Sequence, residues 1–270
     1  MNRKALMILL SAAIVFSCVS MAGADLTTSL VAYYPFSGNA DDATANHNNG
    51  AVSNATLTSD RFGNADSAYY FNGTNAYIQV PFQTYLDRNQ AQGYTVAFWF
   101  RFDNNPGYVD ILDKSHGWPS YNYMNWVIQI SAADGSGTRT FGFGGGNGSA
   151  WLGAADSPIP QDAPQDAQWH HAAGTLLDQT FQFYVDGDLK STSTFSGTVV
   201  DTVGDLFIGR HYNLGRYYQG GIDEIRLYQR ALSGDEIAQL ANVPLPPALI
   251  LFGSGLIGLV GLRRKFKIGA

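Results

Sequence analysis

Residues 217–240, YYQGGIDEIRLYQRALSGDEIAQL, form the most informative stretch of the chain. Residues 222–228 alternate between two sets of side chains, as a β-strand requires. The alternation predicts a core face formed by Asp223, Ile225 and Leu227. A carboxylate on a core face needs a cation or several N–H donors, so Asp223 is a candidate ligand for a metal ion.

The end of this stretch predicts a short helix. Ser233 and Glu236 have the spacing of a capping box, in which each side chain bonds the backbone N–H of the other residue. Ile237 and Leu240 would then face the core.

The pattern G-x-I-D-x-[VI]-R-[IL]-Y followed by A-L-S-x-x-E-I resembles the closing segment of laminin-G-like and pentraxin-like domains of the concanavalin A-like superfamily. The resemblance covers roughly residues 30–241 and implies an all-β, antiparallel, two-sheet jelly-roll sandwich. Four further segments resemble the bacterial branch of that family in the same order: LVAYYPFSG at 30–38, RFGNADSAYYFNGTNAYIQVP at 61–81, WHHA at 169–172 and FYVDG at 183–187.

The N-terminus predicts an exported protein. Residues 1–24 have the basic start, apolar middle and A-x-A end of a secretory signal peptide. The only cysteine, Cys18, lies inside this signal, so the exported domain, residues 25–242, has no disulfide. A lipoprotein signal at Cys18 is the alternative, although Phe16 fits it badly.

The charge of the exported domain argues against nucleic acid as a partner. Residues 25–242 contain ten Lys or Arg and twenty-two Asp or Glu, a net charge of −12. Phosphate backbones bind basic surfaces, and this surface would repel them.

The polar loop at residues 41–50, DDATANHNNG, is a second candidate for metal binding. Asp41, Asp42 and Asn46 offer the hard oxygen donors that calcium prefers. We expect one structural calcium ion to join this loop to Asp223. The alternative is a loop stabilised by its own side-chain turns.

The strand signals are strongest at residues 94–103, where alternating Val and Phe predict a central strand with Trp99 in a covered position. Asn72-Gly73-Thr74-Asn75 predicts a hairpin between two flanking strands. A second hairpin is expected at residues 169–185, with Asp186-Gly187 turning the chain again. The adjacent His170 and His171 would point to opposite faces of their strand, and we expect both to have a structural role.

Exposed aromatic rings in polar loops are typical of sugar sites, because a ring stacks on the apolar face of a sugar. Trp118, Tyr121 and Trp151 are the candidates for ligand binding. The alternative for Trp118 is a plug that fixes its loop to the sandwich.

Catalytic carboxylates are not evident in the sequence. Glycosidases need two carboxyl groups across the scissile bond, and the motif E-x-D-x-x-E of jelly-roll enzymes is absent. Glu224 is expected to pair with Arg226 in solvent. Asp110 and Asp113 are three residues apart, which predicts opposite faces of a strand. We therefore expect a non-catalytic module that binds glycans or other surface polymers, with calcium assistance as one option. The alternatives are a glycoside hydrolase or polysaccharide lyase of the superfamily, or a purely structural matrix protein.

The C-terminal segment at 243–267 resembles a PEP-CTERM sorting signal of the V-P-L-P type, formed here by Val243, Pro244, Leu245 and Pro246. The resemblance implies processing by an exosortase-type enzyme. Residues 247–262 carry no charge and span about 24 Å as a helix, which is short for a permanent membrane span. Basic residues follow this uncharged stretch and should hold the C-terminus in the cytoplasm: Arg263, Arg264 and Lys265. We expect transient anchoring in the inner membrane, followed by release to the cell surface or an extracellular matrix. A permanent anchor is the alternative.

Overall fold

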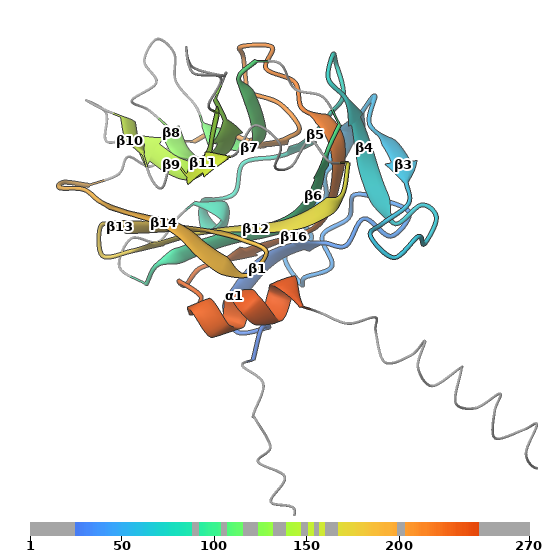
Figure 1. Ribbon diagram of the computed structural model, residues 1–270. Helices are drawn as coiled ribbons and strands as arrows, with labels where there is room; N and C mark the ends of the chain where they lie inside the picture. Colours follow the sequence, from blue (N-terminus) through green and yellow to red (C-terminus); the bar gives the residue numbers. More distant parts are fainter. Residues whose placement is uncertain are drawn as a thin grey trace, which may run out of the picture.

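The computed structural model describes residues 25–87, 92–103, 107–115, 124–131, 139–146, 151–153, 157–159, 167–198 and 203–242. These residues form two eight-stranded sheets stacked as a sandwich, with one helix against the outside of one sheet (Figure 1). The predicted jelly-roll architecture is confirmed.

Sheet A has the strand order β14-β13-β12-β6-β16-β4-β3, and β1 pairs with one end of β16. Its strands are β1 (Leu30–Tyr34), β3 (Thr56–Thr58), β4 (Ala68–Asn72), β6 (Tyr94–Phe102), β12 (Trp169–Leu177), β13 (Thr180–Val185), β14 (Asp188–Thr194) and β16 (Gln219–Tyr228).

Sheet B has the order β10-β9-β8-β7-β15-β5-β2, and β11 pairs with β9. Its strands are β2 (Ala51–Ser53), β5 (Tyr77–Val80), β7 (Val109–Ser115), β8 (Met124–Ile130), β9 (Arg139–Gly146), β10 (Trp151–Gly153), β11 (Ser157–Ile159) and β15 (Leu206–Ile208). A short 3₁₀ helix, η1 (Thr84–Leu86), follows β5.

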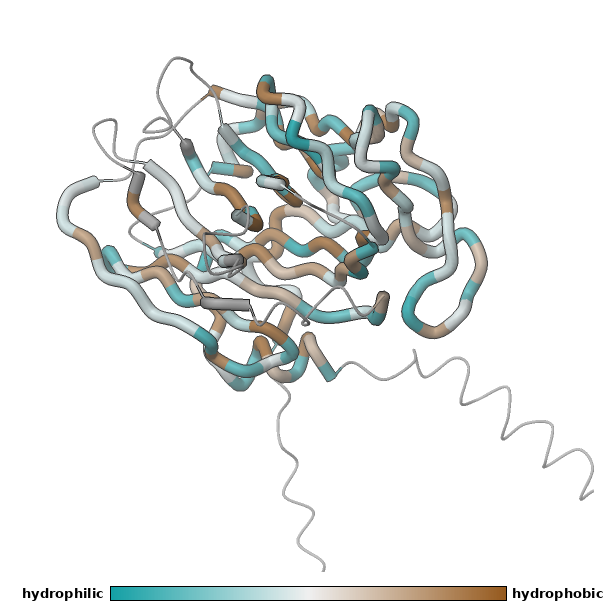
Figure 2. The backbone as a smooth tube through the Cα atoms, turned by 45° about the horizontal axis from the view of Figure 1, so that its top comes forward, coloured by the Kyte–Doolittle hydropathy of each residue, from teal (hydrophilic) through white to brown (hydrophobic). Residues whose placement is uncertain are grey.

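The core lies between the sheets and is rich in phenylalanine. Phe100 of sheet A packs edge-on against Phe141 of sheet B with ring centroids 5.1 Å apart, and Phe181 meets Phe143 at 5.4 Å. In Figure 2 the hydrophobic stretches run along the strands in the middle of the molecule, while hydrophilic stretches lie mostly in the outer turns. Burial of this apolar surface is the main stabilising term, so the domain folds without a disulfide.

The central strand β6 confirms the prediction from alternation. It lies between β12 and β16, and its inward side chains Val96, Phe98, Phe100 and Phe102 are buried. The predicted hairpin at β12 and β13 is also confirmed, as is the turn at Asp186-Gly187, where both residues have positive φ angles as a type I′ turn requires.

The predicted hairpin at residues 72–75 is wrong. β4 pairs with β3 and β16 in sheet A, whereas β5 pairs with β2 and β15 in sheet B. The turn therefore carries the chain from one sheet to the other. The Asn72 side chain fixes this crossing, because its Oδ1 accepts hydrogen bonds from the backbone N–H groups of Thr74, Asn75 and Ala76.

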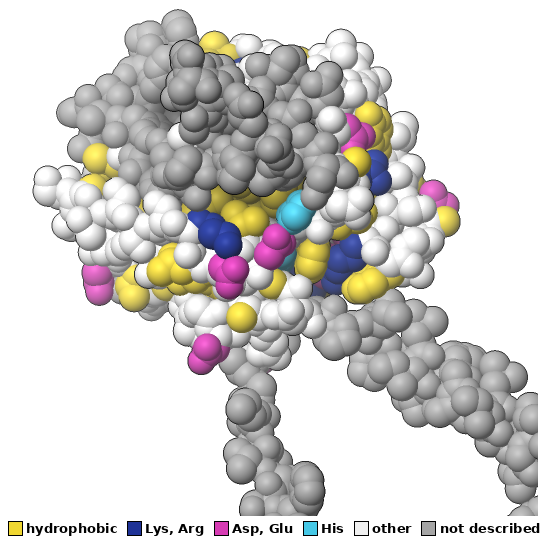
Figure 3. Space-filling view, in the orientation of Figure 1, with side chains coloured by type: hydrophobic (Ala, Val, Ile, Leu, Met, Phe, Trp, Pro, Cys, Tyr) yellow, Lys and Arg dark blue, Asp and Glu magenta, His cyan; other side chains and the backbone are white. Residues whose placement is uncertain are grey.

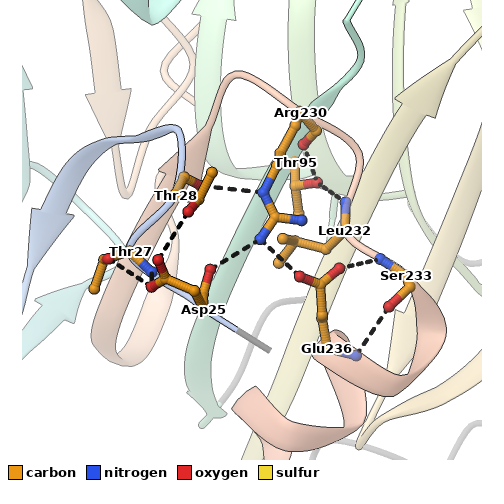
Figure 4. Close-up of polar contacts among 8 residues, drawn as sticks. All are labelled: Asp25, Thr27, Thr28, Thr95, Arg230, Leu232, Ser233 and Glu236. Atoms are coloured by element: carbon orange, nitrogen blue, oxygen red, sulfur yellow. Dashed lines mark hydrogen bonds and ion pairs between the residues drawn. The ribbon is translucent and has the colours of Figure 1, made fainter. Parts of the chain in front are cut away.

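The predicted helix is confirmed as α1 (Gly234–Ala241), with both hydrogen bonds of the capping box between Ser233 and Glu236. Its buried residues Ile237 and Leu240 pack on the outer face of sheet A. Arg230 ties this helix to the start of the described chain: it pairs with Glu236 and donates to the carbonyl oxygens of Asp25 and Thr28 (Figure 4).

Candidate binding site on the outer face of sheet A

A β-bulge in β16 decides where Asp223 lies. Asp223 is opposite Trp99 of β6 and Arg226 is opposite Ala97, so two residues of β16 face one residue of β6. Glu224, inside the bulge, has a φ of 55°. The extra residue reverses the alternation, which places Asp223 on the outer face and Ile222, Ile225 and Leu227 in the core. The predicted position of Asp223 on the core face is therefore wrong.

The partner of Asp223 is a guanidinium. Its Oδ2 lies 3.5 Å from a terminal nitrogen of Arg61, and the two side chains are only 3% and 9% exposed. Burial, together with the neighbouring Glu224, raises the pKa of Asp223 to about 8, and Arg61 acts in the opposite direction. The carboxyl group of Asp223 therefore lies next to a positive charge. The effect of Arg61 on its pKa is smaller than the effect of burial.

Aromatic rings enclose Arg61. The centre of its guanidinium lies 4.2 Å from the ring centroid of Phe62 and 4.3 Å from that of Trp99, which are cation–π distances. Trp99 in turn packs edge-on against the buried His171, with centroids 5.5 Å apart. Trp169 covers Gly221, where an added Cβ would lie 2.7 Å from its indole.

Arg61 and the aromatic residues Phe62, Trp99 and Trp169 line a surface pocket of about 370 Å³. Its lining combines three aromatic residues with a guanidinium and two amides: Phe62, Trp99, Trp169, Arg61, Gln168 and Asn242, together with Ala241. The volume lies at the small end of the range for small-molecule sites. Aromatic faces beside amide groups suit a ligand with apolar C–H faces and many hydroxyl groups, as a sugar has. Figure 3 shows one face of the molecule, on which hydrophobic, basic, acidic and histidine side chains lie next to one another.

Glu224 is occupied by structural contacts. The Tyr33 hydroxyl lies 3.0 Å from both of its carboxylate oxygens, and Arg226 forms an ion pair with it. The expected pairing of Glu224 with Arg226 is confirmed. Arg226 also stacks over the ring of Tyr33, a residue of β1, at 4.2 Å. Each of the three side chains thus contacts the other two.

The histidines lie as predicted on opposite faces of β12. His171 contacts Trp99 on the outer face, and His170 contacts Phe100 and pairs with Asp186 at 2.8 Å. Burial lowers the pKa of His171 to about 3, so it is neutral at physiological pH.

The predicted calcium ligands of loop 41–50 and Asp223 bind different groups in the structure. Asp42 is buried and both of its oxygens accept hydrogen bonds, five in all, from Tyr33, Thr44 and Asn48. Asn46 donates to the carbonyl oxygen of Val31, and Asp41 is exposed. This loop fits a calcium ion poorly, because N–H and O–H donors already fill the directions a cation would need. The calcium hypothesis remains a prediction.

The predicted ligand-binding residues Trp118 and Tyr121 lie outside the described residues. Trp151 begins β10, where its backbone pairs with Gly146. Its side chain is not among the parts of the chain that the structure describes. The sorting residues and the basic C-terminus also lie outside it. Within the described ranges, no helix is long and apolar enough to cross a membrane.

The sequence did not identify Trp99 and Trp169 as pocket residues. Trp99 was expected to be covered, and it is half-buried on the outer face. One signal was present: Asp223 needed a cation, and Arg61 lies in another of the segments that resemble the family.

A second polar cluster lies on sheet B. Asp110, Asp113 and His211 are fully or almost fully buried and offer ligand atoms within 4.8 Å of one another. The predicted placement of the two aspartates on opposite faces is wrong, because a register shift in β7 between Asp110 and Leu112 adds a residue to the strand. Burial raises the pKa of Asp110 well above its usual range and that of Asp113 to about 6.

His211 in its present orientation does not suit a metal ion. Its Nδ1 accepts hydrogen bonds from the backbone N–H groups of Asn213 and Leu214 at 3.1 and 3.0 Å. The proton of the neutral ring must then be on Nε2, which points toward the two aspartates at 3.9 and 4.0 Å. A metal-bound histidine normally donates from its second nitrogen instead. Arg216 also lies 3.8 Å from Asp110 and supplies the positive charge.

A family model described as the concanavalin A-like lectin/glucanases superfamily matches residues 72–238. The chain belongs to this superfamily. A second model, the PEP-CTERM protein-sorting motif, matches residues 242–265. Among curated proteins, none matches the chain.

Several solved structures resemble this chain in fold. Domain 4 of AbnA, an extracellular GH43 arabinanase of Geobacillus stearothermophilus solved with arabinotriose, has a TM-score of 0.61 and 20% identity over 79% of this chain and 98% of that one. The binding domain of Paraclostridial Mosquitocidal Protein 1 has a TM-score of 0.64 and 16% identity over 79% of this chain. Trypanosoma rangeli sialidase has a TM-score of 0.56 and 17% identity, also over 79%. This chain spans about half of the mosquitocidal domain (52%) and a third of the sialidase (32%).

Proposed function

We propose that the domain is an exported, non-catalytic binding module for glycans or other surface polymers. The observation that carries the proposal is the outer-face pocket, where Phe62, Trp99 and Trp169 present aromatic surface beside amide groups. The arabinotriose bound to domain 4 of AbnA supports the same ligand class for a similar fold.

The alternative is a glycoside hydrolase or polysaccharide lyase, since the superfamily includes enzymes. The burial of the carboxyl groups argues against it. Asp223 is 3% exposed, and Asp110 and Asp113 are 0% exposed, so a polysaccharide would not reach them. Glu224 is bonded by Tyr33 and Arg226. General acid–base catalysis requires a carboxyl group within hydrogen-bonding reach of the substrate.

Export and sorting complete the proposal. The PEP-CTERM motif implies export and processing by an exosortase-type enzyme. We propose that the uncharged residues 247–262 anchor the precursor in the inner membrane for a limited time. The released domain would then act at the cell surface or in an extracellular matrix. A purely structural matrix role would require no ligand at the pocket.

A glycan array with the purified domain, with and without calcium, tests the binding role. We expect binding that Trp169→Ala reduces at least about tenfold, because the indole forms part of the pocket. Tyr108→Ala is the control: Tyr108 is an exposed aromatic residue (49%) that lies beside sheet B, away from the pocket lining. Binding that both variants leave unchanged would refute the assignment of this pocket. Release of reducing ends or unsaturated sugars by the wild type would favour the enzyme.

A further inference from the structure

The binding pocket and the sorting motif meet at one residue. Ala241 and Asn242 line the pocket, and the PEP-CTERM motif begins at residue 242. The pocket wall and the membrane-directed tail are therefore not separated by a linker.

Asn242 is held in place, so the point where the tail leaves the domain is fixed. Its backbone N–H bonds the carbonyl oxygens of Ala238 and Gln239, and its side-chain amide bonds Ala238 as well. The helix that ends there is itself fixed by the buried Ile237 and Leu240 and by the pair of Arg230 with Glu236 (Figure 4).

The short tail limits the distance between pocket and membrane. Five residue steps separate Asn242 from Pro247, where the uncharged stretch begins, and they extend to at most about 17 Å. The polar layer of one leaflet occupies about 5 to 7 Å of this distance. The pocket wall would thus stay within roughly 10 Å of the lipid headgroups.

We infer that the membrane blocks this pocket while the C-terminal tail anchors the chain, and that removal of the tail opens it. The inference rests on the proposed binding role and adds its regulation by processing. A polymer ligand needs space on both sides of the pocket, which a bilayer at this distance does not leave. Binding at the site would begin only after sorting is complete.

Thiol labelling tests access to the pocket without requiring a ligand. Cys18→Ser removes the single cysteine of the 270-residue sequence, so an introduced cysteine is the only thiol in it. Gln168→Cys places the thiol at the pocket. Val203→Cys, at a position that is 68% exposed just before β15 of sheet B, is the matched control. The probe is a maleimide carrying a polyethylene glycol of about 5 kDa.

Three forms are compared in phosphatidylcholine nanodiscs or after release from them. The first keeps the natural spacing. The second carries a Gly-Ser segment of about 15 residues between Asn242 and Val243, which adds about 20 Å on average. The third is the second form after proteolytic cleavage within that segment. We expect labelling at residue 168 to be at least about tenfold slower in the first form than in the other two, with equal rates at residue 203.

Equal labelling of residue 168 in the first and second forms would overturn the inference. Failure of the glycan array would remove the proposed ligand class but would not change these labelling rates. The two failures are therefore distinguishable.

Discussion

The two sheets each carry a buried carboxylate cluster created by a β-bulge, and they differ in what covers it. On sheet A, Asp223 faces Arg61 beside an aromatic pocket that is open to solvent. On sheet B, Asp110 and Asp113 lie beneath the segment that connects β15 to β16, which contributes His211 and Arg216. A bulge alone thus turns a carboxylate toward the outside of a sheet. Whether a usable surface results depends on the segment packed above it.

The largest expected effect concerns the two glycines beside these clusters. Gly209, with a φ of 85°, begins the cover of sheet B, and an added Cβ would overlap the Phe71 ring in the core. Gly209→Ala should lower the free energy of unfolding by about 3 kcal/mol, because strain and overpacking add. Gly221→Ala meets the half-buried Trp169, which can shift, and should cost about 1 kcal/mol. Urea denaturation measures both; equal losses would contradict the comparison.

The next largest difference should come from replacing one ionisable side chain at each carboxylate cluster, Arg61 on sheet A and Asp110 on sheet B. Asp223 holds a proton at neutral pH, so Arg61→Ala mainly removes the cation–π stack between Phe62 and Trp99, which should cost about 2 kcal/mol. Asp110→Asn should cost less than about 1 kcal/mol, because neither oxygen of Asp110 has a hydrogen-bond partner within the described residues. Thermal and urea unfolding report the difference. A larger decrease in the free energy of unfolding for Asp110→Asn than for Arg61→Ala would show that the carboxylate of Asp110 stabilises the cluster on sheet B.

The pH dependence of the free energy of unfolding should change when Asp223 is replaced. Its folded-state pKa of about 8 lies above the ordinary 3.8, so the folded protein holds a proton that the unfolded chain releases. This stability is complete below pH 3.8 and is lost as the pH rises toward 8. The contribution of His171, whose pKa is lowered to about 3, has the opposite sign and is complete above pH 6.5.

Between pH 6.5 and 8, Asp223 should therefore lower the free energy of unfolding by up to about 2 kcal/mol. Asp223→Asn should reduce the decline by this amount, as measured by urea unfolding across that range, and the decline that remains comes from Asp110, whose pKa burial also raises. Asp66→Asn, at an exposed turn, should retain the full decline. A decline unchanged in Asp223→Asn would assign it to other groups.

Metal ions should have the smallest effect. If calcium binds loop 41–50 with a dissociation constant near 1 mM, then 1 mM calcium stabilises the domain by only about 0.4 kcal/mol. Asp42→Asn should abolish the small rise in Tm, measured by differential scanning calorimetry. A Tm that neither calcium nor chelator changes would refute the calcium hypothesis. Zinc should leave the sheet B cluster unaffected, because the Nδ1 of His211 already accepts two hydrogen bonds.

The sequence predicted elements whose signal is local. The alternation in β6, the turn residues at Asp186-Gly187 and the capping box of α1 each specify a structure through neighbours within a few positions. The family resemblance supplied the sandwich as a whole.

The predictions were wrong where one extra residue in a strand turns the following side chains to the other face of the sheet, or where the chain crosses to the other sheet. Alternation assumes two residues per repeat, so the bulges in β7 and β16 reversed the expected positions of Asp113 and Asp223. The Asn72 turn looked like a hairpin, because turn chemistry does not specify whether the next strand stays in the same sheet. The pocket depends on contacts between Arg61, Trp99 and Trp169, which are far apart in the chain and have no local signature.

The Arg230 contacts described above bring the beginning and the end of the folded chain together. Arg230 donates to Asp25 at one end and pairs with Glu236 of the last helix at the other. The domain is therefore almost a closed ring, and a circular permutant that joins the two ends through a short linker should keep both sheets. The exposed crossing at Thr74 is the natural place to open such a ring, since cutting there separates β4 from β5 without breaking a strand pair.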